Sequence, residues 1–118
     1  MSNKFENLDA WKWAKKLVIF TYTLTDKYPA KENFCLVSQT TRAAVSVAAN
    51  IAEGCSRSST RDFSHFLEIA IGSIFELETL LIIGFERKYI CANDYLQIKN
   101  VLENTIRLTF GLKRKINE

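Results

Sequence analysis

The feature that most constrains the fold is a charge-poor stretch of small residues between Gln39 and Gly54. From Asn33 to Ala52 the only charged side chain is that of Arg42, so a helix here must hide most of its circumference against other protein. Several alanines, which are good helix formers with short side chains, let neighbouring backbones approach closely. They are Ala43, Ala44, Ala48, Ala49 and Ala52. The stretch predicts the central helix of a helical bundle.

The rest of the chain is typical of an all-α protein, because four Gly and one Pro in 118 residues leave few places to break a helix. The periodicity predicts helices at about residues 8–27, 33–54, 60–88 and 93–115. We expect a single domain, residues 1–118, folded as an antiparallel up-down-up-down four-helix bundle. We expect Asn7 or Asp9 to cap the first helix and Tyr28-Pro29 to end it. Gly54 is expected to end the second helix. Ser59 with Asp62 should cap the third helix, and Asn93 should cap the fourth.

The first helix carries more apolar surface than one bundle needs. One stripe suffices for a four-helix core, so we expect another copy of the chain to cover the second. In the third helix Ile69, Leu80 and Ile83 also lie away from the main apolar face, which favours the same conclusion. The first stripe is Leu8, Trp11, Ala14, Val18, Tyr22 and Thr25, and the second, the expected oligomer interface, is Trp13, Leu17, Phe20 and Leu24.

Composition and cysteine usage point to the cytoplasm. No apolar run approaches the roughly 18 residues that a membrane span needs, and the first residues lack the apolar core of a signal peptide. Cys35, Cys55 and Cys91 are an odd number at wide spacing, which suits reduced thiols better than disulfides. We therefore expect a cytoplasmic protein that does not engage a membrane.

Polar residues inside apolar faces have two interpretations. Glu78 falls within the apolar face of the third helix, so it should pair, and Arg42 is the obvious candidate. With Asn50 and Glu53, Arg42 follows one side of the second helix. These residues could hold an acid for proton transfer, or they could form a structural polar network that fixes the helix neighbours. A general acid needs a pocket and partner catalytic residues, and the sequence indicates neither. This favours a structural network of Arg42, Asn50, Glu53 and Glu78.

Motifs for catalysis, metal and cofactors are missing from the sequence. A di-iron bundle needs a Glu-x-x-His motif on two helices, whereas this chain has one histidine, His65, followed by Glu68 in the reverse order. A single histidine near a helix start also has no marked nucleophile or orienting acid. No phosphate loop, Cys-x-x-Cys pair or dinucleotide fingerprint occurs. We expect no enzymatic activity, no metal and no cofactor.

Basic residues gather at one end of the expected bundle, although the net charge is only +3. In an alternating bundle the start of the first helix, the turn between the second and third helices and the C-terminus share one end. A ring of copies would multiply the positive charge there and bind phosphates of RNA or DNA; ordinary solvated lysines are the other interpretation. We call this end the basic pole, and it comprises Lys4, Lys12, Lys15, Lys16, Arg57, Arg61, Lys113, Arg114 and Lys115, with Glu6, Asp9, Glu53, Asp62 and Glu118 as its acidic residues.

Seven motifs together resemble a known family, the four-helix-bundle proteins encoded in bacterial 23S rRNA intervening sequences, also called the S23 family. The match extends over nearly the whole chain, with slight departures at Val45, Val47 and Cys55. The motifs are Leu8-x-x-Trp11, Tyr28-Pro29, Gln39-x-x-Arg42-Ala-Ala-x-Ser46, Asn50-Ile-Ala-Glu-Gly54, Phe66-Leu-x-Ile-Ala70, Gly72-Ser73 and Glu76-Leu-Glu-Thr79.

The resemblance implies an antiparallel four-helix bundle assembled as a homopentamer, with no established catalytic activity. A related accessory protein of diversity-generating retroelements is a pentameric barrel that binds nucleic acid and a reverse transcriptase. Two functions follow as expectations. The first is an oligomeric module whose basic pole binds RNA or DNA as an accessory to a nucleic-acid enzyme, and the second is a protein-binding scaffold with no nucleic-acid role.

Overall fold

The computed structural model describes residues 4–118, which form four long α-helices and two short 3₁₀ helices. No strand occurs in this part of the chain, so the all-α class is confirmed. The long helices are α1 (Asp9–Thr25), α2 (Leu36–Cys55), α3 (Thr60–Glu86) and α4 (Ala92–Ile116), and the short ones are η1 (Lys4–Asn7) and η2 (Ala30–Glu32).

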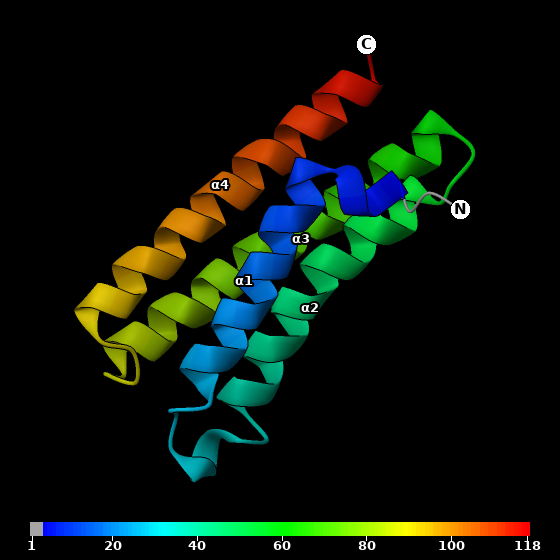
Figure 1. The fold of residues 1–118 in the computed structure, drawn as a ribbon. Coiled ribbons are helices and arrows are strands. Elements are labelled where there is room, and N and C mark those ends of the chain that lie inside the picture. Colours follow the sequence, from blue (N-terminus) through cyan, green and yellow to red (C-terminus); the bar gives the residue numbers. More distant parts are fainter. Residues whose placement is uncertain (1–3) are drawn as a thin grey trace.

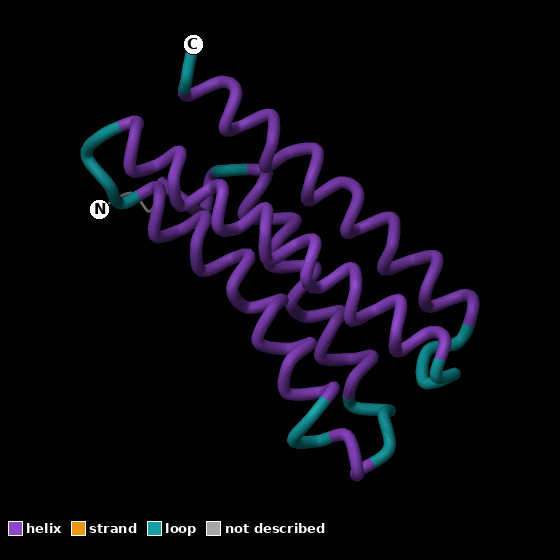
Figure 2. Tube along the Cα trace, turned by 180° about the vertical axis from the view of Figure 1, so that it is seen from behind, coloured by secondary structure: helices purple, strands orange, loops and turns teal. Residues whose placement is uncertain are grey.

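The four long helices lie side by side in a molecule of 43 × 24 × 24 Å (Figure 1). Helix α1 packs against α2 and α4, and α3 packs against the same two helices. The loops that join the helices lie at the two ends of the molecule (Figure 2). The N-terminal end of α1, the α2–α3 turn and the C-terminal end of α4 share one of these ends, which brings the elements of the basic pole together (Figure 1).

Helix α2 buries its small residues against its neighbours but is not more central than the other helices. Ala43, Ala44 and Val47 are fully buried, as the sequence predicts for a close backbone approach. Helix α2, however, contacts only α1 and α3 among the long helices, and Val45 and Ala49 are exposed on its outer side. The expectation of a central helix is therefore wrong, and part of the charge-poor surface of α2 faces outward.

The core face of α1 differs from the one predicted. Leu17 and Leu24, expected at an oligomer interface, are 0% and 2% exposed inside a single chain, while Tyr22, expected in the core, is 47% exposed. The buried face runs between the two predicted stripes, so both stripes contribute to one core. Trp13 and Phe20 are half-buried at its margin. Leu17 and Leu24 are therefore not available to a second copy, and the prediction that they form an interface is wrong.

Several predicted helix boundaries hold and others move. Ser59 caps α3 as expected, because its Oγ accepts the backbone N–H of Asp62 at 3.1 Å. The residues before α1 and α4 are Leu8 and Cys91, and neither side chain makes a capping bond, so the expected caps at Asn7 or Asp9 and at Asn93 are wrong. Helix α1 is instead entered from η1, where the Leu8 N–H donates to the Phe5 carbonyl at 3.0 Å.

Gly54 lies inside α2 rather than beyond its end. No glycine among the described residues has a positive φ, so Gly54 is not a left-handed helix terminator. A Cβ at this position would lie 2.9 Å from the Phe66 Cβ and 3.0 Å from the Phe63 Cδ1. Gly54 is therefore needed for the close approach of α2 and α3 near the basic pole.

Candidate functional site: the basic pole and its groove

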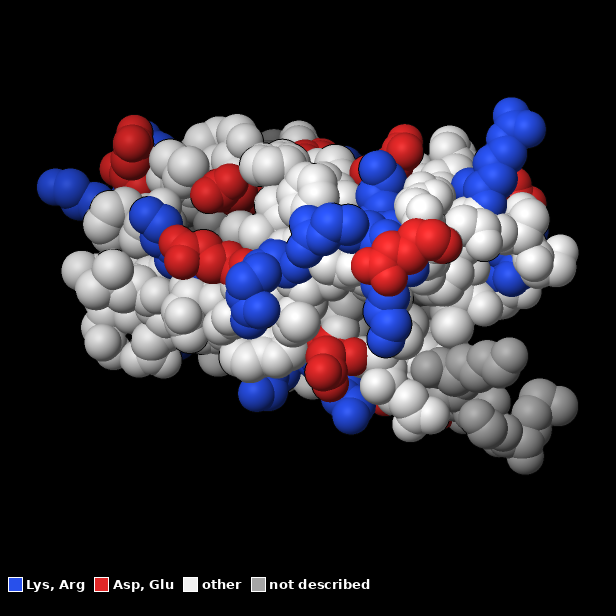
Figure 3. All heavy atoms as spheres, turned by 90° about the horizontal axis from the view of Figure 1, so that it is seen from above, with Lys and Arg blue, Asp and Glu red and all other residues white. Residues whose placement is uncertain are grey.

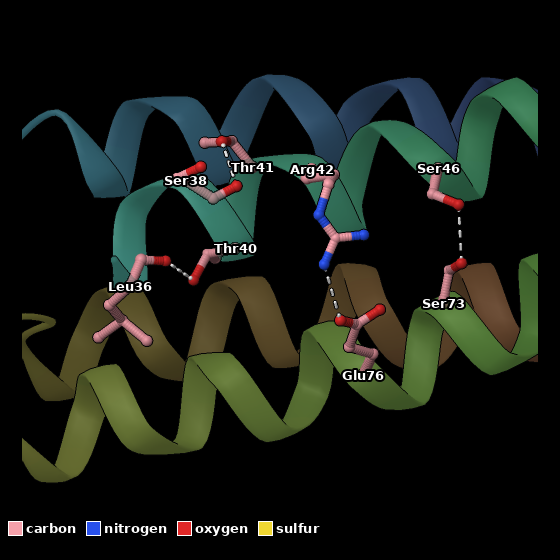
Figure 4. A network of polar contacts seen from close by, with 8 residues as sticks. All are labelled: Leu36, Ser38, Thr40, Thr41, Arg42, Ser46, Ser73 and Glu76. Carbon is pink, nitrogen blue, oxygen red and sulfur yellow. Dashed lines mark hydrogen bonds and ion pairs between the residues drawn. The ribbon is translucent and has the colours of Figure 1, made fainter. Parts of the chain in front are cut away.

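A seam of polar side chains joins α2 to α3 (Figure 4). The Ser46 and Ser73 hydroxyls lie 2.8 Å apart, and the Asn50 Nδ2 donates to the Ser46 carbonyl at 2.8 Å and to its Oγ at 3.0 Å. One turn further along, Arg42 pairs with Glu76 at 3.3 Å, and both side chains are largely exposed. The partly buried hydroxyl pair fixes the register of two helices, whereas an exposed ion pair adds less than about 1 kcal/mol.

Two members of the predicted polar network lie elsewhere. Arg42 bonds Glu76 and not Glu78, because positions two apart on a helix point in nearly opposite directions. Glu78 lies on the side of α3 that faces α4, where it lines a cavity of about 10 Å³ beside Tyr95 and Lys99. Glu53 bonds Arg57 at 2.6 Å within the end of α2 and its following turn. The seam therefore consists of Arg42, Asn50 and their partners, without Glu53 and Glu78.

Most side chains of the basic pole are exposed. Looking down on the molecule, Lys and Arg side chains run across the middle of the visible face with acidic side chains beside them (Figure 3). Arg57 is paired with Glu53, and the half-buried Lys113 lies 3.5 Å from Glu68. The Lys4 side chain lies outside the part that the structure describes. Six exposed cations of the basic pole form no ion pair within residues 5–118, namely Lys12, Lys15, Lys16, Arg61, Arg114 and Lys115.

An open groove of about 600 Å³ separates the start of α1 from the end of α4. Three cationic side chains, those of Arg107, Arg114 and Lys115, line it against a single carboxylate, that of Asp9. The Arg107 guanidinium also donates to the Asn104 Oδ1 at 3.0 Å. The remaining lining residues are Asn7, Leu8, Ala10, Leu108, Gly111 and Leu112. The groove therefore has an excess of positive charge over a polar and apolar floor.

Arg107 is a member of this site that the sequence prediction missed. It lies seven residues before Arg114, and positions seven apart fall on one side of a helix with only about 20° of drift. That spacing is the signal that could have found it. The prediction grouped basic residues by their distance from a helix end and so stopped at Lys113.

Three cations of the basic pole lie over aromatic rings. The Lys16 Nζ is 4.4 Å from the centroid of the Trp13 ring, and the Lys15 Nζ is 5.3 Å from that of Trp11. From the turn after α2, the Arg57 guanidinium lies 4.7 Å from the Phe66 ring. All three rings are half-buried. Positive charge and aromatic surface are therefore interleaved at this end.

His65 lines a separate hollow on the same end, with Arg61, Ser64, Glu68 and Asn117.

Among residues 4–118, no group of three or more His, Cys, Asp or Glu side chains is placed to hold a metal ion. A search of the helices in the described part of the chain finds none with the length and hydropathy of a membrane span.

Apolar side chains also reach the surface along the outer side of α3. Ile69 and Ile83 lie fourteen residues apart, and Phe75 and Ile82 lie seven apart, so each pair occupies one side of the helix. All four are exposed, and Phe75 is 51% exposed. The sequence prediction placed Ile69 and Ile83 outside the core, which is their position here, but Leu80, predicted with them, is buried.

Two comparisons with known proteins name the same family. The fold resembles that of a crystal structure of a protein with unknown function from the S23 ribosomal protein family of Bacteroides thetaiotaomicron. The two chains are 22% identical with a TM-score of 0.80, and the match covers 89% of this chain and 95% of the other. A comparison with the curated proteins gives no match. Residues 6–111 match the sequence model of the 23S rRNA-intervening sequence proteins. A match over that much of the chain places this protein in the 23S rRNA-intervening sequence protein family.

Proposed function

We propose that this protein is a non-enzymatic cytoplasmic module that binds RNA or DNA through its basic pole, as an accessory to a nucleic-acid enzyme. The observation that carries the proposal is the groove in which Arg107, Arg114 and Lys115 face one carboxylate. Arginine guanidinium groups bind phosphate oxygens through paired hydrogen bonds, and each phosphate that is neutralised releases condensed counterions. A groove of this kind suits a phosphodiester backbone.

The proposed assembly is a homopentamer of antiparallel up-down-up-down bundles. The alternation of helix direction is supported by the short loops at both ends and by the path of the chain in Figure 1. The outer side of α3 supports the assembly, because Ile69, Phe75, Ile82 and Ile83 expose apolar surface that a second copy would cover. A ring would place several basic poles around one axis and raise the local positive charge.

The experiment compares two variants with the same reduction in positive charge. One replaces the groove cations, as Arg107→Gln, Arg114→Gln and Lys115→Gln. The control replaces three exposed cations near the opposite end, as Lys27→Gln, Lys31→Gln and Lys88→Gln. Binding of a fluorescent oligonucleotide is measured by anisotropy at low salt.

We expect the groove variant to bind at least about tenfold more weakly and with a shallower salt dependence, by roughly one unit of slope for each phosphate that it no longer binds. The control should retain most of the affinity. An equal weakening of binding in the two variants would refute the placement of the site in the groove, since only the total charge would then matter.

A protein-binding scaffold is the second candidate. One observation favours it: Phe34, in the connection between η2 and α2, is 94% exposed. A protruding aromatic side chain is a typical anchor for a partner protein. Failure of the wild-type protein to bind any oligonucleotide at low salt would remove the first proposal and leave this one.

A further inference from the structure

We infer that the basic pole takes single-stranded nucleic acid, with bases stacked on its aromatic rings and phosphates held by its cations. The inference rests on the proposed function and restricts the ligand from RNA or DNA in general to single strands. It is carried by the pairing of Lys15, Lys16 and Arg57 with Trp11, Trp13 and Phe66, which come from two helices and the turn after a third.

The three rings are already ordered by packing. Each is half-buried, so packing restricts its motion while part of its surface reaches solvent. Trp11 is held further by an edge-to-face contact with Phe5, with ring centroids 5.1 Å apart. A ring that is already ordered loses little conformational entropy when a base stacks on it.

One of the three rings, that of Trp13, lies on the side of α1 that carries the groove residue Ala10. Trp13 follows the groove residue Ala10 by three positions, which is about one helical turn, so both lie on the same side of α1. A phosphate near Arg107 or Arg114 would therefore leave its base within reach of the Trp13 surface. Alternation of cations and rings is the pattern by which proteins hold unpaired strands without reading their sequence.

A duplex would use this surface poorly. Its bases are stacked on one another and present only their edges, so their faces cannot meet the tryptophan rings. Duplex phosphates could still contact the groove cations. If bases stack on the rings, the affinity for a single strand should therefore exceed that for a duplex. If only charge matters, the two affinities should be similar.

The test uses the full-length wild-type protein with RNA and DNA oligonucleotides, each as a single strand and as a duplex of the same length. Affinity is measured by anisotropy, and the two tryptophans, Trp11 and Trp13, report stacking through their intrinsic fluorescence. We expect each strand to bind about tenfold or more tightly than its duplex, and to quench tryptophan emission where the duplex does not.

Variants Trp13→Leu and Phe66→Leu keep the groove cations and should reduce this preference for single strands. Circular dichroism checks that the variants fold. If they do not fold, the fluorescence measurement on the wild-type protein still tests the inference. If a duplex binds as tightly as its own strand with unchanged tryptophan emission, the inference is overturned and the proposed function survives. If neither ligand binds at low salt, the proposed function itself fails.

Discussion

At the scale of single residues, two glycines on facing helices have opposite roles. Gly54→Ala would force a methyl group to within 2.9 Å of the Phe66 Cβ, so the two backbones must separate. Gly72→Ala meets nothing within 4 Å and raises helix propensity. We expect urea denaturation to show a loss of about 1–3 kcal/mol for the first change and a gain of about 0.5–1 kcal/mol for the second. Equal effects would contradict the packing role of Gly54.

Tyr28 makes stability depend on alkaline pH. Its hydroxyl is buried against Gly84 without a hydrogen-bond partner in the described chain. Burial raises the pKa of Tyr28 to about 12 from an ordinary value of 10.0, and the nearby Tyr89 adds to the rise. The unfolded chain loses this proton first, so the contribution is complete below about pH 10 and is lost as pH rises through about 12.

We therefore expect the free energy of unfolding to fall between about pH 10 and 12, with this residue contributing at most about 1.4 kcal/mol per pH unit. Tyr28→Phe should remove that part of the slope, and Tyr22→Phe, which changes an exposed tyrosine, should not. Denaturation curves at several alkaline pH values measure the difference. Parallel slopes for wild type and Tyr28→Phe would contradict the role given to this hydroxyl.

Residue-level prediction from the sequence succeeded at the cap of α3 and failed at the caps of α1 and α4. Ser59 could be identified as a cap because the bond it makes lies within one turn. The partner of Arg42 could not, because a choice between Glu76 and Glu78 depends on the rotation of α3. Arg107 was missed because it lies further from the end of α4 than the other basic residues, although its seven-residue spacing from Arg114 places both on one side of the helix.

At the scale of elements, the start of α3 depends on a single capping side chain. The Ser59 Oγ bond to the Asp62 N–H satisfies one of the four free amides at the helix start. We expect Ser59→Ala to destabilise the protein by about 1 kcal/mol, with the neighbouring exposed Ser58→Ala as the matched control. Thermal and urea unfolding would show it, and an equal effect at both serines would mean that the cap contributes nothing specific.

Helix existence was predictable for all four long helices, but the orientation of α1 was not. Its apolar residues span a wide arc, and the sequence does not say where neighbours divide that arc. The structure centres the core on Thr21, which belongs to neither predicted stripe, with Ala14 of the first stripe and Leu17 of the second on its two sides. Small and β-branched polar residues can fill such a core, because the Thr21 hydroxyl bonds the Leu17 carbonyl at 2.7 Å.

At the scale of the whole molecule, the proposed interface between copies is the outer side of α3, whereas the sequence predicted it on α1. Ile69→Lys with Ile83→Lys would place charges on apolar surface that a second copy would bury. We expect light scattering to show a smaller particle for this variant, with helix content unchanged. Leu96→Lys, on an exposed position of α4, is the control. A wild-type protein that is monomeric at micromolar concentration would contradict the assembly.

Fold class and family could be predicted from the sequence because both depend on the order and spacing of residues along the chain. The small residues of α2 and the motifs from Leu8 to Thr79 are examples. The site could be predicted only as an end of the bundle. Its groove, the Trp13–Lys16 contact and the exposed side of α3 depend on how helices are rotated and spaced.

The salt dependence of oligonucleotide binding tests the central claim, that the basic pole binds phosphates, most directly. The logarithm of the association constant is measured against the logarithm of salt concentration, from about 50 to 200 mM. We predict a straight line with a slope of about −2 or steeper, as expected for three groove cations on a single strand, and therefore a fall of at least about tenfold. Binding that does not change with salt, or no binding at about 50 mM salt, would contradict the claim.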